Sequence, residues 1–175
     1  KVKEKIKPFN KIIEVDSDKS LSIRSFLIGS ICQNISTVTN VLESEDVKST
    51  IEACKKLGVK IVKSNSGSYK IYGKGLGSLF AKKNTVINCF NSGTLARLLL
   101  GILSTTPKIE IIMTGDSSLR KRSMKKLVLL MSEFGATFLP KNKFNFPLKL
   151  ISTDMPIGIN YSAGVSAQLK SAVIL

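Results

Sequence analysis

The stretch Leu57-Gly58-Val59-Lys60-Ile61 returns 77 residues later as Phe134-Gly135-Ala136-Thr137-Phe138. In both places an apolar helical pattern ends at a glycine and a run of strand-forming residues begins. Glycine directly after a helix is a common helix stop. The same join at this spacing indicates an internal repeat, in which supersecondary units stack and share a core. We therefore expect an α/β (α+β) protein built from repeated units.

The same order of elements extends outward from both joins, because helical apolar patterns alternate with short strand-like runs. In the first unit we expect helices over 20–31 and 45–57 and strands over 36–42, 59–63 and 69–72. In the second we expect helices over 93–103 and 119–134 and strands over 108–113, 136–139 and 148–151. A third unit begins with a strand over 157–161 and a helix over 166–175. Each complete unit reads β-α-β-α-β-β.

A second repeated feature is a hydroxyl residue followed one helical turn later by a basic residue. The pairs are Ser20 with Arg24, Thr94 with Arg97, and Ser166 with Lys170. Their hydroxyls are 74 and 72 residues apart, and each pair opens a helical pattern. A helix N-terminus offers free N–H groups and a positive dipole end, which suit anions. Three such termini in one fold predict a site for a ligand that carries several negative charges.

The basic residues carry two different signals. The formal net charge of +15 invites a nucleic-acid interpretation, yet 23 of the 27 basic residues are scattered lysines and only 6% of the chain is aromatic. We favour solvated surface lysines and keep a basic nucleic-acid-binding module as an alternative. The arginines lie in or beside polar segments, where a planar guanidinium suits phosphate or carboxylate. The alternative interpretation is that each of the four arginines forms an ordinary ion pair; these residues are Arg24, Arg97, Arg120 and Arg122.

Composition excludes several classes of function. Without histidine the chain cannot supply imidazole acid–base catalysis or histidine metal ligands. Cys32, Cys54 and Cys89 have no zinc or disulfide spacing, so we expect buried, reduced thiols in a cytosolic protein. No apolar run approaches the roughly 20 residues that span a membrane, and there is no signal-peptide pattern. The chain begins without methionine and ends inside an apolar helical run, so we expect a fragment.

Four polar segments carry a resemblance to a known family. They are Asp18-Lys19-Ser20-Leu21-Ser22-Ile23-Arg24, Asn91-Ser92-Gly93-Thr94-Leu95-Ala96-Arg97, Gly115-Asp116-Ser117-Ser118-Leu119-Arg120-Lys121-Arg122 and Ser166-Ala167-Gln168-Leu169-Lys170-Ser171. In this order and spacing they resemble the enolpyruvyl transferases, and within that family the enzymes that act on shikimate 3-phosphate. The resemblance covers essentially the whole chain, as the N-terminal portion of a longer enzyme.

The resemblance assigns roles to individual residues. Lys19 would lie between the two substrates and be the catalytic, electrostatic group of this chain. The residues implied for shikimate 3-phosphate are Lys19, Ser20, Arg24, Ser166, Ala167 and Gln168. Those implied for phosphoenolpyruvate are Lys19, Gly93, Arg122 and Gln168, with Asn91, Thr94 and Arg97 in support. Simpler interpretations stay open: a surface lysine at 19, a helix N-cap at Ser20, a solvated arginine at 24 and a tight turn at Gly93. Arg97 could merely brace the loop, and Arg120 is taken as solvated.

The resemblance also implies an activity and an architecture. The reaction would transfer the enolpyruvyl group of phosphoenolpyruvate to the 5-hydroxyl of shikimate 3-phosphate and release phosphate, in the route to chorismate and the aromatic amino acids. No metal or cofactor is implied. The full-length fold would be a two-domain inside-out barrel with the substrates between the domains. Residues 1–16 would begin the other domain, and 17–175 would form a truncated N-terminal domain.

Several further expectations depend on this architecture. The residues that move protons would lie in the missing half, so this chain alone is expected to be inactive. We expect a cytoplasmic monomer whose partners are its two small-molecule substrates, with neither nucleic acid nor membrane bound. A non-catalytic relative that binds a phosphorylated metabolite is the second alternative, beside the nucleic-acid-binding module.

Overall fold

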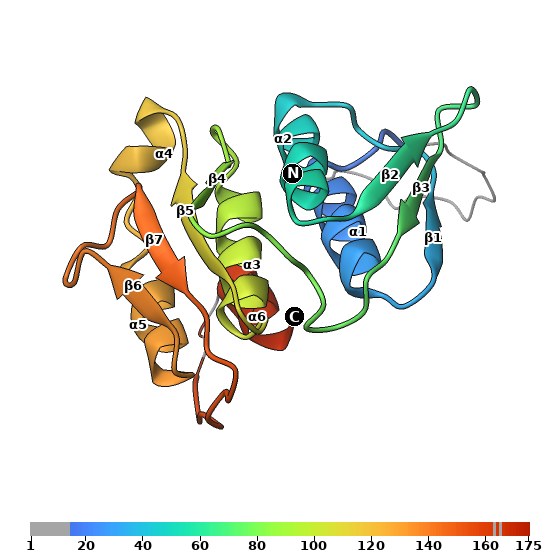
Figure 1. The fold of residues 1–175 in the computed structure, drawn as a ribbon. Coiled ribbons are helices and arrows are strands. Elements are labelled where there is room, and N and C mark those ends of the chain that lie inside the picture. The colour runs from blue at the N-terminus through green and yellow to red at the C-terminus, as the bar shows by residue number, and fades with distance from the viewer. Residues whose placement is uncertain (1–14, 163, 165) are drawn as a thin grey trace, which may run out of the picture.

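The computed structural model describes residues 15–162, 164 and 166–175. The elements of the first unit are α1 (Lys19–Ile31), β1 (Ile35–Val38), α2 (Glu45–Lys56), β2 (Lys60–Lys63) and β3 (Tyr69–Tyr72). Those of the second unit are β4 (Thr85–Asn88), α3 (Gly93–Ser104), β5 (Glu110–Thr114), α4 (Ser117–Lys121), α5 (Lys125–Glu133), β6 (Thr137–Leu139) and β7 (Leu148–Ile151). Helix α6 (Ala167–Ile174) follows them, so two successive units and a further helix are present, as the sequence predicts (Figure 1).

The two joins that reveal the repeat fold in the same way. Gly58 and Gly135 both have positive φ, +84° and +113°. At each join the glycine N–H donates to the carbonyl three residues back, over 3.0 Å, and the next N–H donates to the carbonyl five residues back, over 3.1 Å. These two bonds form a Schellman motif, and its left-handed residue is tolerated best by glycine. Glycine therefore fixes where each second helix of a unit ends.

The strand order repeats along with the joins. The first sheet has the order β1-β3-β2, and both pairs are antiparallel. The second sheet has the order β4-β5-β7-β6, in which β5-β7-β6 matches the first sheet and β4 adds a parallel strand beside β5. The strand that the repeat would place before α1, and most of the segment 1–16 assigned to the other domain, lie outside the described residues.

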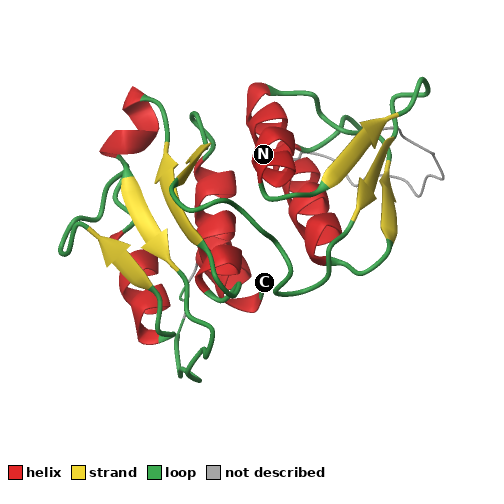
Figure 2. Ribbon diagram, in the orientation of Figure 1, coloured by secondary structure: helices red, strands yellow, loops and turns green. Residues whose placement is uncertain are grey.

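Helices α1, α2, α3 and α6 form the inner layer of the molecule. Figure 2 shows the two sheets toward opposite sides of the view, with α1, α2, α3 and α6 between them. Every residue of α3 except Arg97 is buried, so this helix is the centre of the core. Helix α6 packs very closely on it, since a Cβ built on Gly101 would lie 2.0 Å from the Ala172 carbonyl oxygen. This close packing brings the third unit against the second.

The single helix predicted over 119–134 is wrong, because it is two helices. Arg122 ends α4 in an extended conformation, with φ −79° and ψ 130°. Two residues later Met124 is almost fully buried, and its N–H donates to the Phe144 carbonyl over 2.7 Å. Anchoring Met124 to the chain before β7 redirects the backbone between α4 and α5. The break leaves the Arg122 side chain at the end of a short helix instead of on the side of a long one.

Three other expectations also fail. Residues 157–161 form no strand, because Ile157 donates its N–H to the Phe134 carbonyl, at the end of α5, instead of to a strand ladder. The strand expected over 36–42 ends at Val38, shortly before Asn40 takes a positive φ of +51°. Cys32 follows the end of α1 and is exposed, whereas Cys54 and Cys89 are buried as expected. In addition, β4 was not located from the sequence.

Candidate anion-binding site

Four helices begin around one pocket. Each is capped by the side chain just before it, which accepts a hydrogen bond from the backbone N–H three residues on. The caps of α1, α2, α3 and α6 are Asp18, Ser44, Ser92 and Ser166, with bonds of 2.7, 3.4, 3.3 and 3.3 Å. Ser20 is therefore not the N-cap of α1. The sequence predicted three such helix starts, and the structure adds that of α2, so four positive dipole ends meet here.

The pocket between these helix starts has a volume of about 340 Å³. It is lined by Lys19, Ser20, Asp46, Asn91, Gly93, Thr94, Arg97, Arg122 and Gln168. Eight of these nine residues were predicted from the sequence, and they come from both units and from α6. Segments about 70 residues apart in the chain thus meet in one small polar pocket, as the repeated pairs of a hydroxyl and a basic residue predicted.

Two arginines lie against the glycine of the α3 start. A Cβ built on Gly93 would lie 2.8 Å from Nη1 of Arg97 and 3.1 Å from Nη1 of Arg122. Arg97 also donates to the Gly93 carbonyl over 3.2 Å, and Arg122 Nη2 donates to Asn91 Oδ1 over 2.8 Å. The missing side chain therefore admits both guanidinium groups, so glycine here does more than form a tight turn.

The electrostatics of Arg97 reflect its surroundings. Burial lowers the pKa of Arg97, and the like charge of Arg122 lowers it further. A guanidinium nevertheless stays protonated at neutral pH. Two nearby cations, one of them half-buried, are held together without a carboxylate between them. Such an arrangement favours a ligand that brings negative charge.

Gln168 connects α6 to α3 at the pocket wall. Its Oε1 accepts a hydrogen bond from Arg97 Nη1 over 3.0 Å, and its Nε2 donates to Thr94 Oγ1 over 3.1 Å. Both ends of the amide are used, which fixes its orientation. Arg97 consequently braces the 91–93 loop through Gly93 and α6 through Gln168. The interpretation of Arg97 as a bracing residue fits these contacts.

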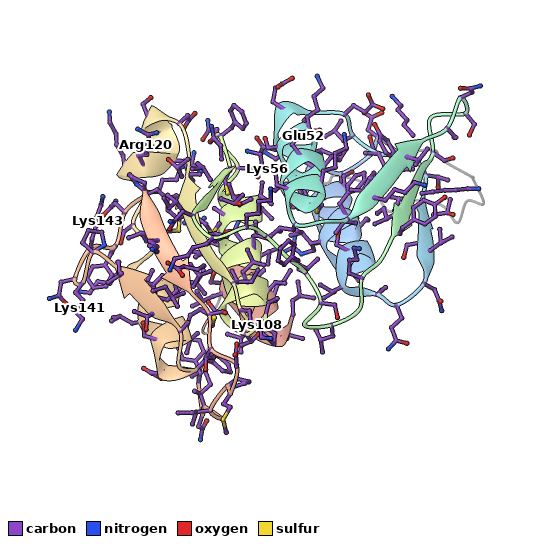
Figure 3. All side chains as sticks on the ribbon, in the orientation of Figure 1. Glu52, Lys56, Lys108, Arg120, Lys141 and Lys143 are labelled. Atoms are coloured by element: carbon purple, nitrogen blue, oxygen red, sulfur yellow. The ribbon has the colours of Figure 1, made fainter. Side chains whose placement is uncertain are left out.

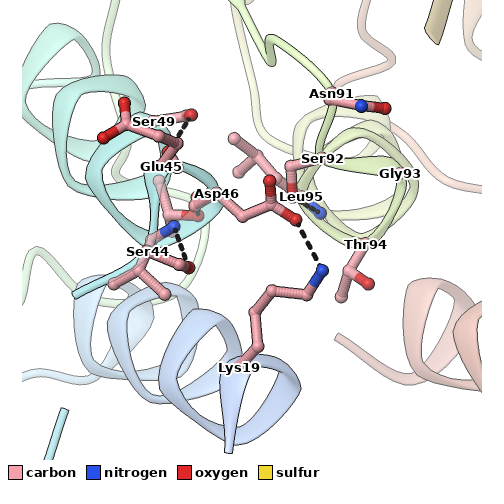
Figure 4. A network of polar contacts seen from close by, with 12 residues as sticks. Lys19, Ser44, Glu45, Asp46, Ser49, Asn91, Ser92, Gly93, Thr94 and Leu95 are labelled. Carbon is pink, nitrogen blue, oxygen red and sulfur yellow. Dashed lines mark hydrogen bonds and ion pairs between the residues drawn. The ribbon is translucent and has the colours of Figure 1, made fainter. Parts of the chain in front are cut away.

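Lys19 forms the ion pair of the pocket. Its Nζ lies 3.0 Å from Oδ2 of Asp46, which is in the first turn of α2 (Figure 4). The lysine side chain is 50% exposed and the aspartate side chain 20% exposed. Asp46 was not among the residues predicted for the site, and Ser44 caps α2. The one sequence feature that could have indicated Asp46 is its position as an acidic residue in the first turn of the helix expected over 45–57.

The arginines differ from the lysines in their partners. Throughout the described part of the chain, every ion pair is made by a lysine. The arginines donate instead to neutral oxygens: Arg24 to the Ser20 carbonyl over 3.3 Å, and Arg120 to the Gly115 carbonyl over 2.7 Å. For these residues the interpretation as ordinary ion pairs is wrong. Arg120 is exposed on α4 and does not line the pocket, in agreement with its predicted solvation (Figure 3).

Three predicted site residues do not line the pocket. Arg24 lies one turn into α1 and bonds its own helix, and Ala167 is exposed at the start of α6. Ser166 caps α6 and borders a larger cavity of about 810 Å³, which Arg97 also lines. The roles of Arg24, Ser166 and Ala167 in holding a substrate stay predictions, as does the expectation that no metal or cofactor takes part.

Comparison with known proteins identifies relatives of this chain. Residues 3–175 match the family model described as EPSP synthase (3-phosphoshikimate 1-carboxyvinyltransferase). The chain is 37% identical over 163 residues to 3-phosphoshikimate 1-carboxyvinyltransferase of Jannaschia sp. (strain CCS1), which covers 93% of this chain and 36% of the relative. It is 42% identical over 164 residues to the enzyme of that name from Caldicellulosiruptor saccharolyticus, covering 93% and 37%.

The fold matches as well. The solved EPSP synthase from Acinetobacter baumannii superposes with a TM-score of 0.82 at 36% identity, over 92% of this chain and 36% of that one. The chain thus spans a little over a third of the length of the relatives it matches. Its α/β repeat architecture is that of the enolpyruvyl transferase fold. With a family model matched over residues 3–175, this chain belongs to the EPSP synthase family.

Proposed function

We propose that this chain is the substrate-binding part of a 3-phosphoshikimate 1-carboxyvinyltransferase. The whole protein would transfer the enolpyruvyl group of phosphoenolpyruvate to the 5-hydroxyl of shikimate 3-phosphate and release phosphate. The observation that carries this proposal is the pocket where four helix starts meet Lys19, Arg97 and Arg122. Both substrates are anionic, and positive dipole ends with guanidinium and ammonium groups suit them.

The reaction gives each group of the pocket a task. The hydroxyl oxygen adds to C2 of phosphoenolpyruvate and gives up its proton, while C3 gains a proton. The tetrahedral intermediate then loses a proton from C3 and phosphate from C2, which forms the C=C double bond again. Arg122, beside the open backbone of Gly93, would hold phosphoenolpyruvate. Lys19 would bridge the two substrates, and Ser20 and Gln168 would face shikimate 3-phosphate together with Arg24, Ser166 and Ala167. Fixed positive charge stabilises the anionic groups without reorganising during the reaction.

The proton-transfer groups are proposed to lie outside this chain. The lining residues of the pocket include no histidine, and Asp46 is already paired with Lys19. We therefore expect the 175 residues alone to bind substrate groups without turnover. Detectable phosphate release by this chain alone would contradict that division of labour.

A basic nucleic-acid-binding module is less well supported. The lysines labelled in Figure 3 lie on different elements: Lys56 is on α2, Lys108 precedes β5, and Lys141 and Lys143 lie in the turn between β6 and β7. Nucleic-acid binding needs a basic surface that follows the phosphate backbone.

Among the described residues, no helix is long and apolar enough to cross a membrane.

The decisive experiment measures phosphate release by the full-length protein given both substrates. Release should require both and fall by at least a hundredfold in Arg122→Ala, because a bidentate cation is removed from the site. Arg120→Ala is the matched control, since it removes the same side chain two residues away and outside the pocket. No release from well-folded protein would favour the non-catalytic relative. Equal losses of phosphate release in the two variants would contradict a role for Arg122 in the site.

We also propose a cytoplasmic location. All three cysteines are free thiols, and unpaired cysteines are typical of reducing compartments. Fractionation of the source cells with an antibody against the protein would test this, and recovery outside the cytoplasmic fraction would contradict it.

A further inference from the structure

Lys19 differs from the two other cations of the pocket in its partner. Arg97 and Arg122 donate to neutral oxygens of Gly93, Gln168 and Asn91. Lys19 instead is 3.0 Å from the Asp46 carboxylate. Asp46 is the one carboxylate among the residues that line the pocket. The cation implied to bridge the two substrates is thus already neutralised by a group of the protein.

Capping of α2 does not require the Asp46 carboxylate. Ser44 caps α2, and Asp46 uses only its backbone carbonyl within the helix, where it accepts from Thr50 Oγ1 over 2.8 Å. Glu45 also offers a negative charge to the helix dipole in the same turn, but it is exposed and pairs with Lys48. Figure 4 shows Lys19 extending from α1 to Asp46, beside Gly93 and Thr94 at the start of α3.

Packing holds Asp46 at this position. Helices α1 and α2 lie against each other, and the buried Ser22 hydroxyl accepts a hydrogen bond from the Leu42 N–H over 3.1 Å. That bond ties the chain before α2 to the first turn of α1. The aspartate is mostly buried and the lysine half exposed, so the ammonium is the more mobile partner. An incoming ligand could therefore draw Lys19 away while Asp46 stays in place.

We propose that Asp46 is a built-in counter-anion, which Lys19 exchanges for a ligand oxyanion and which weakens the binding of anions that enter the pocket. The proposal rests on the proposed function in that the same pocket receives the anionic substrates. A monovalent anion gains little by replacing the carboxylate, because one negative charge is substituted for another. A phosphate dianion can replace it, because it also attracts Arg97 and Arg122, which line the same pocket, but the carboxylate that remains repels a dianion more strongly than a monovalent anion.

The cost of the exchange is small enough to be overcome. Ion pairs with this degree of exposure contribute little to stability, and salt screens them. Removing the carboxylate should strengthen anion binding by about 3- to 10-fold at low salt, and more for phosphate than for a monovalent anion, because the repulsion that is lost scales with the charge of the ligand. A purely structural role for Asp46 predicts no change in anion affinity. A role in orienting Lys19 for binding predicts weaker binding.

The test is calorimetric titration of the full-length protein with inorganic phosphate and with formate at pH 8, at low and at high salt. Asp46→Asn is compared with Glu45→Gln, which removes the same charge from the same helical turn outside the pocket. We expect Asp46→Asn to bind both anions more tightly, with the larger phosphate-to-formate affinity ratio, and Glu45→Gln to match the unmodified protein within twofold. Equal behaviour of the two variants, or weaker phosphate binding by Asp46→Asn, would overturn the proposal.

Two further variants separate the possible failures. If Arg122→Ala binds phosphate as the unmodified protein does, the pocket is not the anion site, and the proposed function loses its site together with this inference. If Arg122→Ala loses binding while Asp46→Asn behaves like Glu45→Gln, only the role of Asp46 fails. In the Lys19→Gln background, Asp46→Asn should lose most of its effect, because the exchange needs the ammonium. An undiminished effect there would contradict the exchange.

Discussion

Gln168 accepts a hydrogen bond from Arg97 over 3.0 Å, although the two residues are 71 positions apart in the chain. The same amide donates to Thr94, so the first turn of α6 is attached to the first two turns of α3. The contact joins the third repeat to the second through groups that also line the pocket. The proposed anion site and the docking of α6 therefore share one hydrogen-bond network.

A carboxylate at position 168 should harm binding without harming the fold. In Gln168→Glu the new charge would pair with Arg97 and compete with an anionic ligand, so the affinity for inorganic phosphate should fall about tenfold. The melting temperature should stay the same or rise. Gln33→Glu introduces the same change at an exposed position and should leave both quantities unaltered. Unchanged phosphate affinity in Gln168→Glu would argue that Arg97 does not face the ligand.

A methyl group at Gly93 should affect binding more than stability. The nearest atoms to the added Cβ are the guanidinium ends of Arg97 and Arg122, which are flexible and can move. We expect Gly93→Ala to raise the KM for phosphoenolpyruvate of the full-length protein about tenfold or more, with a free energy of unfolding within about 1 kcal/mol of the parent.

Gly101→Ala supplies the opposite case on the same helix. Its Cβ would meet the Ala172 backbone at 2.0 Å, and a backbone cannot yield as a side chain does. Chemical denaturation should show a loss of about 2 kcal/mol or more, caused by overpacking between α3 and α6. Equal stability losses in the two alanine variants would contradict the distinction between them.

The buried hydroxyl of Ser22 should stabilise the arrangement of α1 and α2. It donates to the Asp18 carbonyl over 2.7 Å and accepts from Leu42 N–H. Ser22→Ala leaves that N–H without its partner, so the free energy of unfolding should fall by about 1–3 kcal/mol. Ser25→Ala removes only a bond to the preceding turn of its own helix and should cost less than about 0.5 kcal/mol. Urea denaturation measures both, and similar losses would contradict the role of Ser22.

The three thiols should differ sharply in reactivity. Burial raises the pKa of Cys54 to about 11 and that of Cys89 to about 12, whereas Cys32 is exposed. At pH 7.5 an aromatic disulfide reagent should label one thiol in the native protein and three after denaturation, because thiolates are the reactive form. Rapid labelling of three thiols under native conditions would contradict the burial of Cys54 and Cys89.

The same shifts predict a loss of stability in alkali. The two buried thiols have a higher pKa when folded than when unfolded, so folding favours their neutral form. Their contribution is complete below about pH 9 and declines as the pH rises toward 11 to 12. Replacing both by alanine should flatten the pH dependence of the free energy of unfolding in that range. A slope unaffected by the replacement would assign the alkaline loss to other groups.

Local signals in the sequence determined much of this fold. The glycines at 58 and 135 stop their helices through bonds that span only five residues. The polar segments predicted the starts of α1, α3 and α6 to within one residue, whereas the eight predicted residues of the pocket came from the resemblance to the enolpyruvyl transferases. The helix starts and stops depend on neighbours along the chain, and their hydrogen bonds close within one or two turns.

Tertiary structure decided what local patterns could not express. Met124 breaks the helix predicted over 119–134 because it bonds Phe144, and Ile157 leaves the expected strand because it bonds Phe134. Asp46 enters the pocket because α2 packs on α1, although no local pattern marked it as a site residue. In each case a residue distant in the chain supplies the partner. Local sequence therefore specifies the caps and glycine stops of individual helices, whereas packing specifies the break between α4 and α5 and which helix starts line one pocket, because those contacts join residues that are distant in the chain.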